Sequence, residues 1–344
     1  MDPDDVGLLY VSDDPETFGG HGRLFSARLP TNGKPVRILF DHVNGSTNPR
    51  VSWRVIVALV NVSPATTGHL VVAGRDAGPR QQPPAAGDVG DGTNGMHVGH
   101  VATADFLKAR FIDDDAGEAH VTVAFGQPHV LSSRVLKPPA AGNAKSDGEC
   151  TAGIFDVQAI EPNIAYELRV MAVDPNSDAT VWKQLDKAKN VKEFKARSGV
   201  FTIAGSSASE TIPFGGTTTF GDRTFSRAGD LDPDTDPEHV HKGEYGVIRH
   251  FTCTLATGQT GFLYQSTGST GATATYVLDD GTLLTSARFG PHEDEDKIVA
   301  LEEPSLNVTT MAEINSSLAI TLRSGPDIPK LADAGGPHSR ITVA

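Results

Sequence analysis

The densest group of side chains that could bind a ligand lies in an acidic segment that runs from Asp230 to His241. Calcium takes about six to eight oxygen ligands, and carboxylates that alternate along a loop can converge on one ion. The sequence therefore predicts a calcium site at Asp230, Asp232, Asp234 and Asp236. A second interpretation stays open, because Pro233 and Pro237 interrupt the segment and no glycine supplies the sharp turn of an EF-type loop. The segment would then be a solvated acidic loop.

Two pairs of histidines are candidates for a transition-metal site. His97 and His100 follow Met96, and a thioether with two imidazoles suits copper. His239 and His241 end the acidic segment with one residue between them. Neither pair is specific for metal, since His100 could equally cap or pack against the start of a following helix.

Motifs of hydrolytic enzymes are absent from the sequence. No serine lies in the Gly-x-Ser-x-Gly setting of a nucleophile elbow. The charged run Pro291–Lys297 is typical of a solvated hairpin tip. A catalytic carboxylate pair needs one desolvated group, and nothing in the sequence predicts a pocket around this run. We therefore expect a protein without enzymatic activity.

The chain has two cysteines, Cys150 and Cys253. They could form a disulfide in an oxidising compartment. Cys253 also falls on the same strand face as Val247, Phe251 and Leu255, which indicates a buried thiol as the alternative.

These candidate residues belong to a chain of short strands and turns. The sequence contains 36 glycines and 22 prolines, and such an excess of turn residues favours a β-rich fold. The clearest strand is Val51–Val62, in which Val51, Trp53 and Val55 occupy one face. A similar strand, Tyr245–Leu255, occurs in the second half of the chain.

The length of 344 residues exceeds the usual size of one core. We predict an all-β fold of two β-sandwich domains, residues 1–175 and residues 199–344, joined by a short helical bridge over residues 176–198. We also expect a short helix at His100–Phe111 and a long loop over residues 74–95, where Gly, Pro and Gln predominate.

The formal net charge is -14, from 43 acidic and 29 basic residues. The negative charge repels the phosphate backbones of nucleic acids, so we expect no nucleic-acid partner. No stretch reaches the about 20 apolar residues of a membrane helix. Residues 1–5 lack the basic start and apolar run of a signal peptide. The protein is then either cytosolic, or its numbering begins after a removed signal.

The order of several short motifs resembles a group of bacterial secreted or envelope-associated proteins of unknown function, some of which carry a copper amine oxidase-like label. The motifs are Val36–Gly45, the long strand that ends in Asn61, Val98–Leu107, Ala152–Val157 and Gly243–Val247. The resemblance spans most of the chain and implies an exported, β-rich protein.

Copper amine oxidase activity does not follow from this resemblance. Such an enzyme makes its quinone cofactor from a tyrosine that an asparagine precedes, and the chain has no Asn-Tyr pair. His239 and His241 match only the spacing of two copper ligands. We therefore reject that activity.

The expected function is structural. We predict an exported protein of the cell surface or extracellular matrix that binds other copies of itself or other envelope proteins, and that assembles into a filament or layer through strand edges. The alternative is a carbohydrate-binding module at the cell envelope, with polysaccharide as its ligand. Trp182 and Tyr264 would then be the aromatic residues that stack on a sugar ring.

Overall fold

The computed structural model describes residues 1–13, 17–47, 49–81, 98–113, 117–140, 148–176, 198–231, 240–254, 261–267, 274–285, 296–301, 305–312, 320–325 and 342–343. Strands dominate these segments, which contain one α-helix, α1 (Val98–Phe111), and one 3-10 turn, η1 (Gly229–Leu231). The fold is therefore all-β, as predicted. Within these segments no helix combines the length and apolar character that a bilayer span requires.

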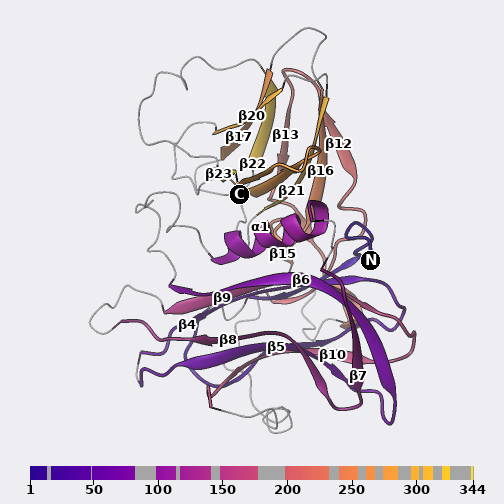
Figure 1. Ribbon diagram of the computed structural model, residues 1–344, viewed down its shortest axis with the longest axis vertical. Helices are drawn as coiled ribbons and strands as arrows, with labels where there is room; N and C mark the ends of the chain where they lie inside the picture. Colours follow the sequence, from indigo (N-terminus) through magenta and orange to yellow (C-terminus); the bar gives the residue numbers. More distant parts are fainter. Residues whose placement is uncertain are drawn as a thin grey trace.

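Two sheets lie face to face in the lower part of Figure 1, and we call them the N-terminal sheet pair. Sheet A has the order β11-β1-β4-β9-β6-β7, with β2 beside β4, and sheet B has the order β3-β10-β5-β8. The bounds in sheet A are β1 (Leu8–Ser12), β2 (Thr17–Phe18), β4 (Val36–Asn44), β6 (Thr67–Gln81), β7 (Ala119–Ala124), β9 (Glu149–Ala159) and β11 (Gly199–Thr202). Those in sheet B are β3 (Gly22–Arg28), β5 (Trp53–Asn61), β8 (Pro128–Leu136) and β10 (Tyr166–Val173).

The space between sheets A and B is filled by buried apolar side chains. Side chains alternate between the faces of a strand, so Ile38 and Phe40 of β4 enter this core while Leu39 points to the outer face of sheet A. Phe40 stacks on Phe155 of β9, with ring centroids 6.4 Å apart and planes inclined by 9°. Every residue of β4 is buried, because the outer face of sheet A is also covered.

A second pair of sheets, the C-terminal sheet pair, lies in the upper part of Figure 1. Sheet C has the order β12-β16-β21-β18-β19-β23, and sheet D has the order β13-β22-β17-β20. The bounds in sheet C are β12 (Ser209–Ile212), β16 (Ile248–Thr254), β18 (Ala274–Leu278), β19 (Leu283–Thr285), β21 (Ser305–Ala312) and β23 (Thr342–Val343). Those in sheet D are β13 (Thr217–Phe220), β17 (Gly261–Thr267), β20 (Asp296–Leu301) and β22 (Ile320–Gly325). A small ribbon of β14 (Thr224–Phe225) and β15 (His241–Lys242) lies near sheet A.

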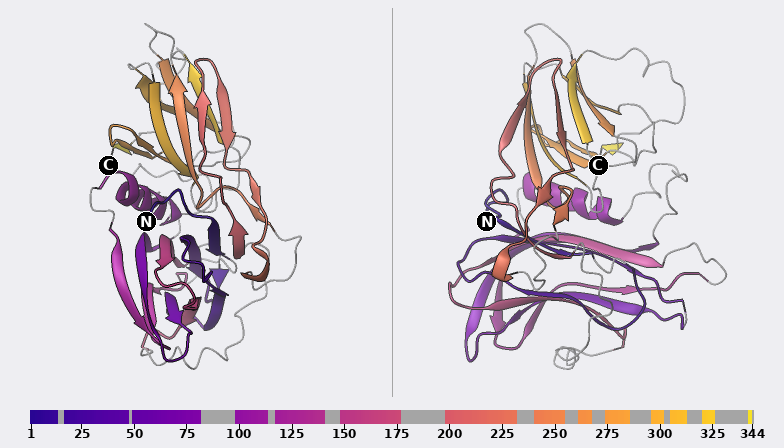
Figure 2. Two further views of the ribbon diagram at one scale, coloured as in Figure 1. Left: turned by 90° about the vertical axis from the view of Figure 1, so that its right-hand side faces the viewer. Right: turned by 180° about the vertical axis from the view of Figure 1, so that it is seen from behind.

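The two sheet pairs share one continuous hydrophobic cluster, which we call the shared core. Helix α1 lies between the pairs, against the outer face of sheet A, in all three views of Figures 1 and 2. The shared core contains Leu39 from sheet A, Phe106 from α1, and Val277 and Met311 from sheet C. Apolar surface of both pairs is therefore buried by their contact, which favours a fixed arrangement of the pairs.

The predicted loop over residues 74–95 is wrong in its first part. Strand β6 continues to Gln81 and stays paired with β9, apart from an irregularity between Ala77 and Arg80. Gly74 lies where the two strands touch, since an added Cβ would come within 2.6 Å of the Phe155 Cα. The glycine there reflects a close backbone approach rather than a turn. Residues 82–95 lie outside the described residues.

The predicted helical bridge over residues 176–198 lies, except for its first and last residues, outside the described part of the chain. The helix expected at His100–Phe111 is confirmed, and it begins two residues earlier, at Val98. Strand β11, which opens the predicted second domain, pairs with β1 in sheet A. Sheet A thus takes a strand from beyond the predicted bridge.

Substitution of Gly153 by alanine tests the packing inside the N-terminal sheet pair. An added Cβ would lie 2.5 Å from Cε1 and 2.6 Å from Cζ of Phe40, so the ring must move within a filled core. Overpacking of this kind costs about 1–3 kcal/mol. We expect Gly153→Ala to lose that much free energy of unfolding in urea. Gly19→Ala is the control, since nothing lies within 4 Å of its added Cβ, and equal losses in both variants would contradict this packing.

Candidate functional site

The residues of the predicted calcium site are only partly described. Asp230 lies in η1 and is exposed. Asp232, Asp234 and Asp236 lie outside the described residues, so the calcium site stays a prediction. Where side chains are described, no group of three or more His, Cys, Asp or Glu is arranged to hold a metal ion.

Each predicted histidine pair has one member, His97 or His239, that lies outside the described residues. His100 is buried in the first turn of α1, and His241 is buried in β15. The copper interpretation therefore stays a prediction. The same holds for the carbohydrate interpretation, since Trp182 lies outside the described residues.

Tyr264, the other aromatic residue of that interpretation, lies in β17, where only the backbone is described. The two cysteines are separate thiols. Cys150 belongs to the shared core and Cys253 to the core between sheets C and D. Burial raises the pKa of the Cys253 thiol to about 12, so it stays protonated and unreactive at neutral pH. The interpretation of Cys253 as a buried thiol is confirmed.

The strongest candidate for a functional centre is the joint between the sheet pairs, where charged side chains are buried. Arg37 of β4 and Asp156 of β9 face each other on the outer side of sheet A, with exposed fractions of 1% and 0%. Arg37 donates from Nε to Asp156 Oδ1 at 2.7 Å and from Nη2 to Oδ2 at 3.0 Å. The pair is therefore bidentate, the strongest geometry between a guanidinium and a carboxylate.

The remaining donors of Arg37 reach other parts of the chain. Nη1 donates to the Gly246 carbonyl at 3.1 Å, and Nη2 donates to the Pro3 carbonyl at 3.0 Å. The guanidinium also lies over the ring of Phe106 in α1, 5.1 Å from its centroid. One side chain thus contacts the N-terminal segment, α1, sheet A and the segment that enters sheet C.

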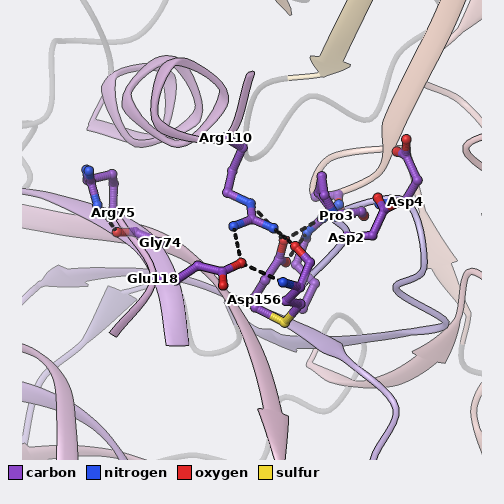
Figure 3. Close-up of polar contacts among 11 residues, drawn as sticks. Asp2, Pro3, Asp4, Gly74, Arg75, Arg110, Glu118 and Asp156 are labelled. Atoms are coloured by element: carbon purple, nitrogen blue, oxygen red, sulfur yellow. Dashed lines mark hydrogen bonds and ion pairs between the residues drawn. The ribbon is translucent and has the colours of Figure 1, made fainter. Parts of the chain in front are cut away.

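Arg110 near the end of α1 extends this network, as Figure 3 shows. Its Nη1 donates to Glu118 at 3.2 Å, its Nη2 donates to the Met1 carbonyl at 2.6 Å, and its Nε lies 3.8 Å from Asp156 Oδ2. The Met1 amine donates to the same Glu118 oxygen at 2.8 Å. Burial alone would raise the pKa of Glu118, but these hydrogen bonds outweigh it and hold the pKa below its ordinary value.

A second buried network lies within the C-terminal sheet pair. Glu244 has no exposed surface and accepts from Arg249 Nη1 at 2.7 Å and from the Gly221 backbone amide. Arg249 also donates to Glu210 of β12 at 3.1 Å. The charges are paired where they are buried, which avoids the cost of an uncompensated buried ion.

Among the described residues, Ser12 and His42 form a contact that resembles a nucleophile with its base. Ser12 Oγ lies 2.9 Å from His42 Nε2, within the reach that proton transfer requires. Both residues have no exposed surface, and His42 shares its strand face with Phe40, inside the N-terminal sheet pair. Asp41 precedes His42 in β4 and so lies on the opposite face, and Asp13 directly follows the end of β1. The pair is sealed inside the fold and serves as an internal hydrogen bond.

The sequence analysis missed the charged residues of the joint. Arg37 and Asp156 are single charges inside apolar strands, at Val36–Phe40 and Ile154–Val157. A charge in such a position needs a buried partner of the opposite sign. That signal points to an ion pair, but it does not identify the partner, which lies 119 residues away.

The Arg37–Asp156 pair can be tested by removing one charge or both. Removing one partner of a buried pair costs about 3–5 kcal/mol, whereas an apolar replacement of both is often neutral. We expect Arg37→Met to lose stability of that order in urea unfolding, and Arg37→Met/Asp156→Leu to recover most of it.

Lys137→Met is the matched control for that test. It removes a cation whose side chain is 76% exposed and lies 3.5 Å from Glu149. Exposed pairs of this kind contribute less than about 1 kcal/mol. If Arg37→Met/Asp156→Leu were less stable than Arg37→Met, the instability of Arg37→Met would not come from the charge of Asp156 left without its partner.

No protein-family model matches the chain, and no curated protein matches it. Solved structures that are similar to it at a low level include two of viruses. One is a human norovirus GI.7 Houston strain VLP of T=3 symmetry, with 10% identity over 86% of this chain and 62% of that chain, and a TM-score of 0.21. The other is the T=1 Penaeus vannamei nodavirus, with 9% identity over 80% of this chain and 81% of that chain, and a TM-score of 0.15. The match spans less than two thirds of the norovirus chain, and TM-scores this low carry no argument about fold or function.

Proposed function

We propose that the chain is a non-enzymatic structural protein, exported to the cell surface or extracellular matrix, that acts by binding other copies of itself or other envelope proteins. In this proposal the two sheet pairs are two β-sandwich domains, and the first of them includes β11 from beyond the predicted bridge. The observation that carries it is the shared core, which includes α1 and strands of both sheet pairs. A structural protein that binds its neighbours needs its two sheet pairs held in one arrangement. A two-domain enzyme, in contrast, usually binds its substrate in a cleft between its domains.

The use of the buried polar groups supports the same proposal. Arg37, Asp156, Glu244 and Arg249 make hydrogen bonds to one another or to the backbone. Ser12 and His42 are sealed between sheets A and B. These groups stabilise the fold and are not presented to a substrate.

Assembly through strand edges requires an edge that the chain itself leaves open. Three edge strands of the N-terminal sheet pair each have a backbone carbonyl that another part of the chain binds. Tyr10 donates its hydroxyl to the Arg28 carbonyl of β3 at 2.8 Å, and Asn61 donates its amide to the Val123 carbonyl of β7 at 2.9 Å. The Ala228 amide donates to the Val200 carbonyl of β11 at 2.8 Å. A carbonyl that is already bound is less available to an added strand.

Strand β12 differs from these three edge strands. It ends sheet C and pairs with β16 on one side, and on its other side no described residue forms a ladder with it. Its residues Ser209 and Thr211 are exposed, and its one charged residue, Glu210, is bound by Arg249. An edge without lysine or proline is open to pairing with another chain, so we assign the assembly contact to β12.

The net charge of -14 opposes association of identical chains. An edge whose one carboxylate, Glu210, is paired with Arg249 is a place where two copies can approach with little repulsion. Salt screens the repulsion that remains between two copies, with a Debye length of about 10 Å at 0.1 M. Association through β12 should therefore strengthen as salt is added.

Lysine substitutions on β12 test this contact. Lysines on an edge strand prevent strand addition without removing backbone hydrogen bonds. We expect the unchanged protein to associate with rising concentration in sedimentation velocity at 0.3 M salt, and Ser209→Lys/Thr211→Lys to stay monomeric over the same range.

The control adds the same charge elsewhere. Thr31 and Gln127 are exposed and lie outside the strands, so Thr31→Lys/Gln127→Lys should associate like the unchanged protein. An unchanged protein that stays monomeric at all concentrations would overturn self-assembly. Association that survives the β12 lysines would overturn the choice of edge.

A further inference from the structure

Four Asn-x-Ser/Thr triplets occur in the chain, at Asn44, Asn61, Asn307 and Asn315. This triplet is the acceptor of N-linked sugar in exported proteins when its middle residue is not proline. The first three asparagines belong to the described residues, and Asn315 lies outside them. A bulky, hydrated oligosaccharide fits a folded protein only where the asparagine amide faces solvent. The surroundings of each amide therefore decide which triplet can carry sugar.

The amides of Asn44 and Asn61 are closed to modification in the folded chain, because neither side chain has exposed surface. Asn44 donates both hydrogens of Nδ2, one to the Val51 carbonyl at 2.8 Å and one to the Leu136 carbonyl at 2.9 Å. Asn61 likewise donates to two backbone carbonyls, at 3.1 and 2.9 Å. A sugar on Nδ2 would replace one of these hydrogens and leave a buried carbonyl without its donor.

Asn307 of β21 has the opposite surroundings. Its side chain is exposed, and it points to the outer face of sheet C because its neighbour Val308 enters the core between sheets C and D. Oδ1 accepts from Thr252 Oγ1 at 2.9 Å, and Nδ2 makes a long, exposed contact with Asp279 Oδ2 at 3.4 Å. Among the described residues Nδ2 has this one acceptor. One of its hydrogens can therefore be replaced by a sugar while the other keeps the contact with Asp279.

The position of Asn307 in sheet C leaves room for a large substituent. Met311, on the same face of β21, belongs to the shared core, and four residues of strand place it about 13 Å from Asn307. Asn307 pairs with Thr252 of β16, which pairs with Thr211 of the edge strand β12. Two strand spacings amount to about 10 Å. A sugar on Asn307 would thus stand clear of the joint and project from the sheet face beside the β12 edge.

We propose that Asn307 is a modification site, at which the exported chain carries an N-linked oligosaccharide on the outer face of sheet C. The inference rests on the proposed export, since the sugar donor, a lipid-linked oligosaccharide pyrophosphate, serves chains that are being exported. In the transfer, Nδ2 of Asn307 forms a bond to C1 of the first sugar. The bond between C1 and the pyrophosphate breaks, the pyrophosphate leaves with the electron pair, and Nδ2 loses one proton to solvent.

Secretion of the full chain from cultured eukaryotic cells, behind an added signal peptide, tests the proposal. Lys297 and Arg323 bound one tryptic peptide that contains both Asn307 and Asn315. Asn315→Gln is therefore introduced throughout, so that one triplet remains in this peptide. In the secreted protein we expect the peptide to carry a sugar mass that peptide N-glycosidase removes, with conversion of Asn307 to aspartate. The peptides that contain Asn44 and Asn61 should carry no sugar.

Asp280→Asn provides the matched control. It creates a triplet with Gly281 and Thr282 in the exposed turn between β18 and β19. The asparagine keeps an oxygen that can accept from the Thr282 amide, as Asp280 does at 2.8 Å. We expect sugar at position 280 of this variant as well as on Asn307, because both amides face solvent.

A bare Asn307 in the secreted protein would overturn the proposal, since secretion itself takes the chain past the transferase. Sugar on Asn44 or Asn61 of the secreted protein would overturn the argument that burial selects among the triplets. Self-association through β12 is measured on chain made without sugar and without a signal peptide. Failure of the glycosylation experiment therefore leaves the sedimentation result unaffected, and the reverse also holds.

Discussion

The buried charge of Arg37 constrains the joint more strongly than any other single group. A guanidinium without exposed surface must have its donors satisfied, and here the acceptors come from β9, from the N-terminal segment and from Gly246. Moving any one of these elements would leave a buried N–H without an acceptor. Gly246 itself has φ +80°, and an added Cβ would lie 2.9 Å from methyl groups of Leu9 and Leu39. Both its conformation and its close approach therefore require glycine.

Apolar burial and polar pairing have different roles in this arrangement. The shared core supplies most of the favourable free energy, since the hydrophobic effect scales with the apolar area removed from water. It is not directional, and leucine and phenylalanine side chains would tolerate several relative positions. The bidentate pair of Arg37 with Asp156 and the network of Glu244 with Arg249 have definite geometries. They select one arrangement among those that the apolar surfaces would allow.

The sequence predicted the elements whose signals are local. Val51–Val62 corresponds to β5, and His100–Phe111 to α1, because alternation and turn residues are visible within a short window. It missed β21, whose polar residues Asn307 and Thr309 alternate with Leu306 and Val308, although this strand lies between β16 and β18. One face of β21 begins exposed at Ser305 and Asn307 and ends buried at Met311, so the alternation of polar and apolar residues is weak and resembled a loop.

The charged residues of the joint could be suspected from the sequence but not paired. Arg37 and Asp156 come together only because β4 and β9 are neighbours in sheet A, and strand order is a property of the whole fold. The predicted site residues lie close together along the chain, and the sequence shows this spacing. It does not show how their side chains lie relative to one another in space. Asp230 is exposed and His100 is buried, two environments that composition alone does not distinguish.

The interleaving of the two halves has a consequence for the order in which the chain can fold as it is synthesised. When residue 176 leaves the ribosome, sheet A still lacks β11, and α1 presents its apolar face without the side chains of Val277, Leu283 and Met311 that later cover it. The first half therefore cannot reach its final state until most of the second half has been made. Until the second half has been synthesised, this apolar surface must be protected from contact with other chains, a task for which cells use chaperones.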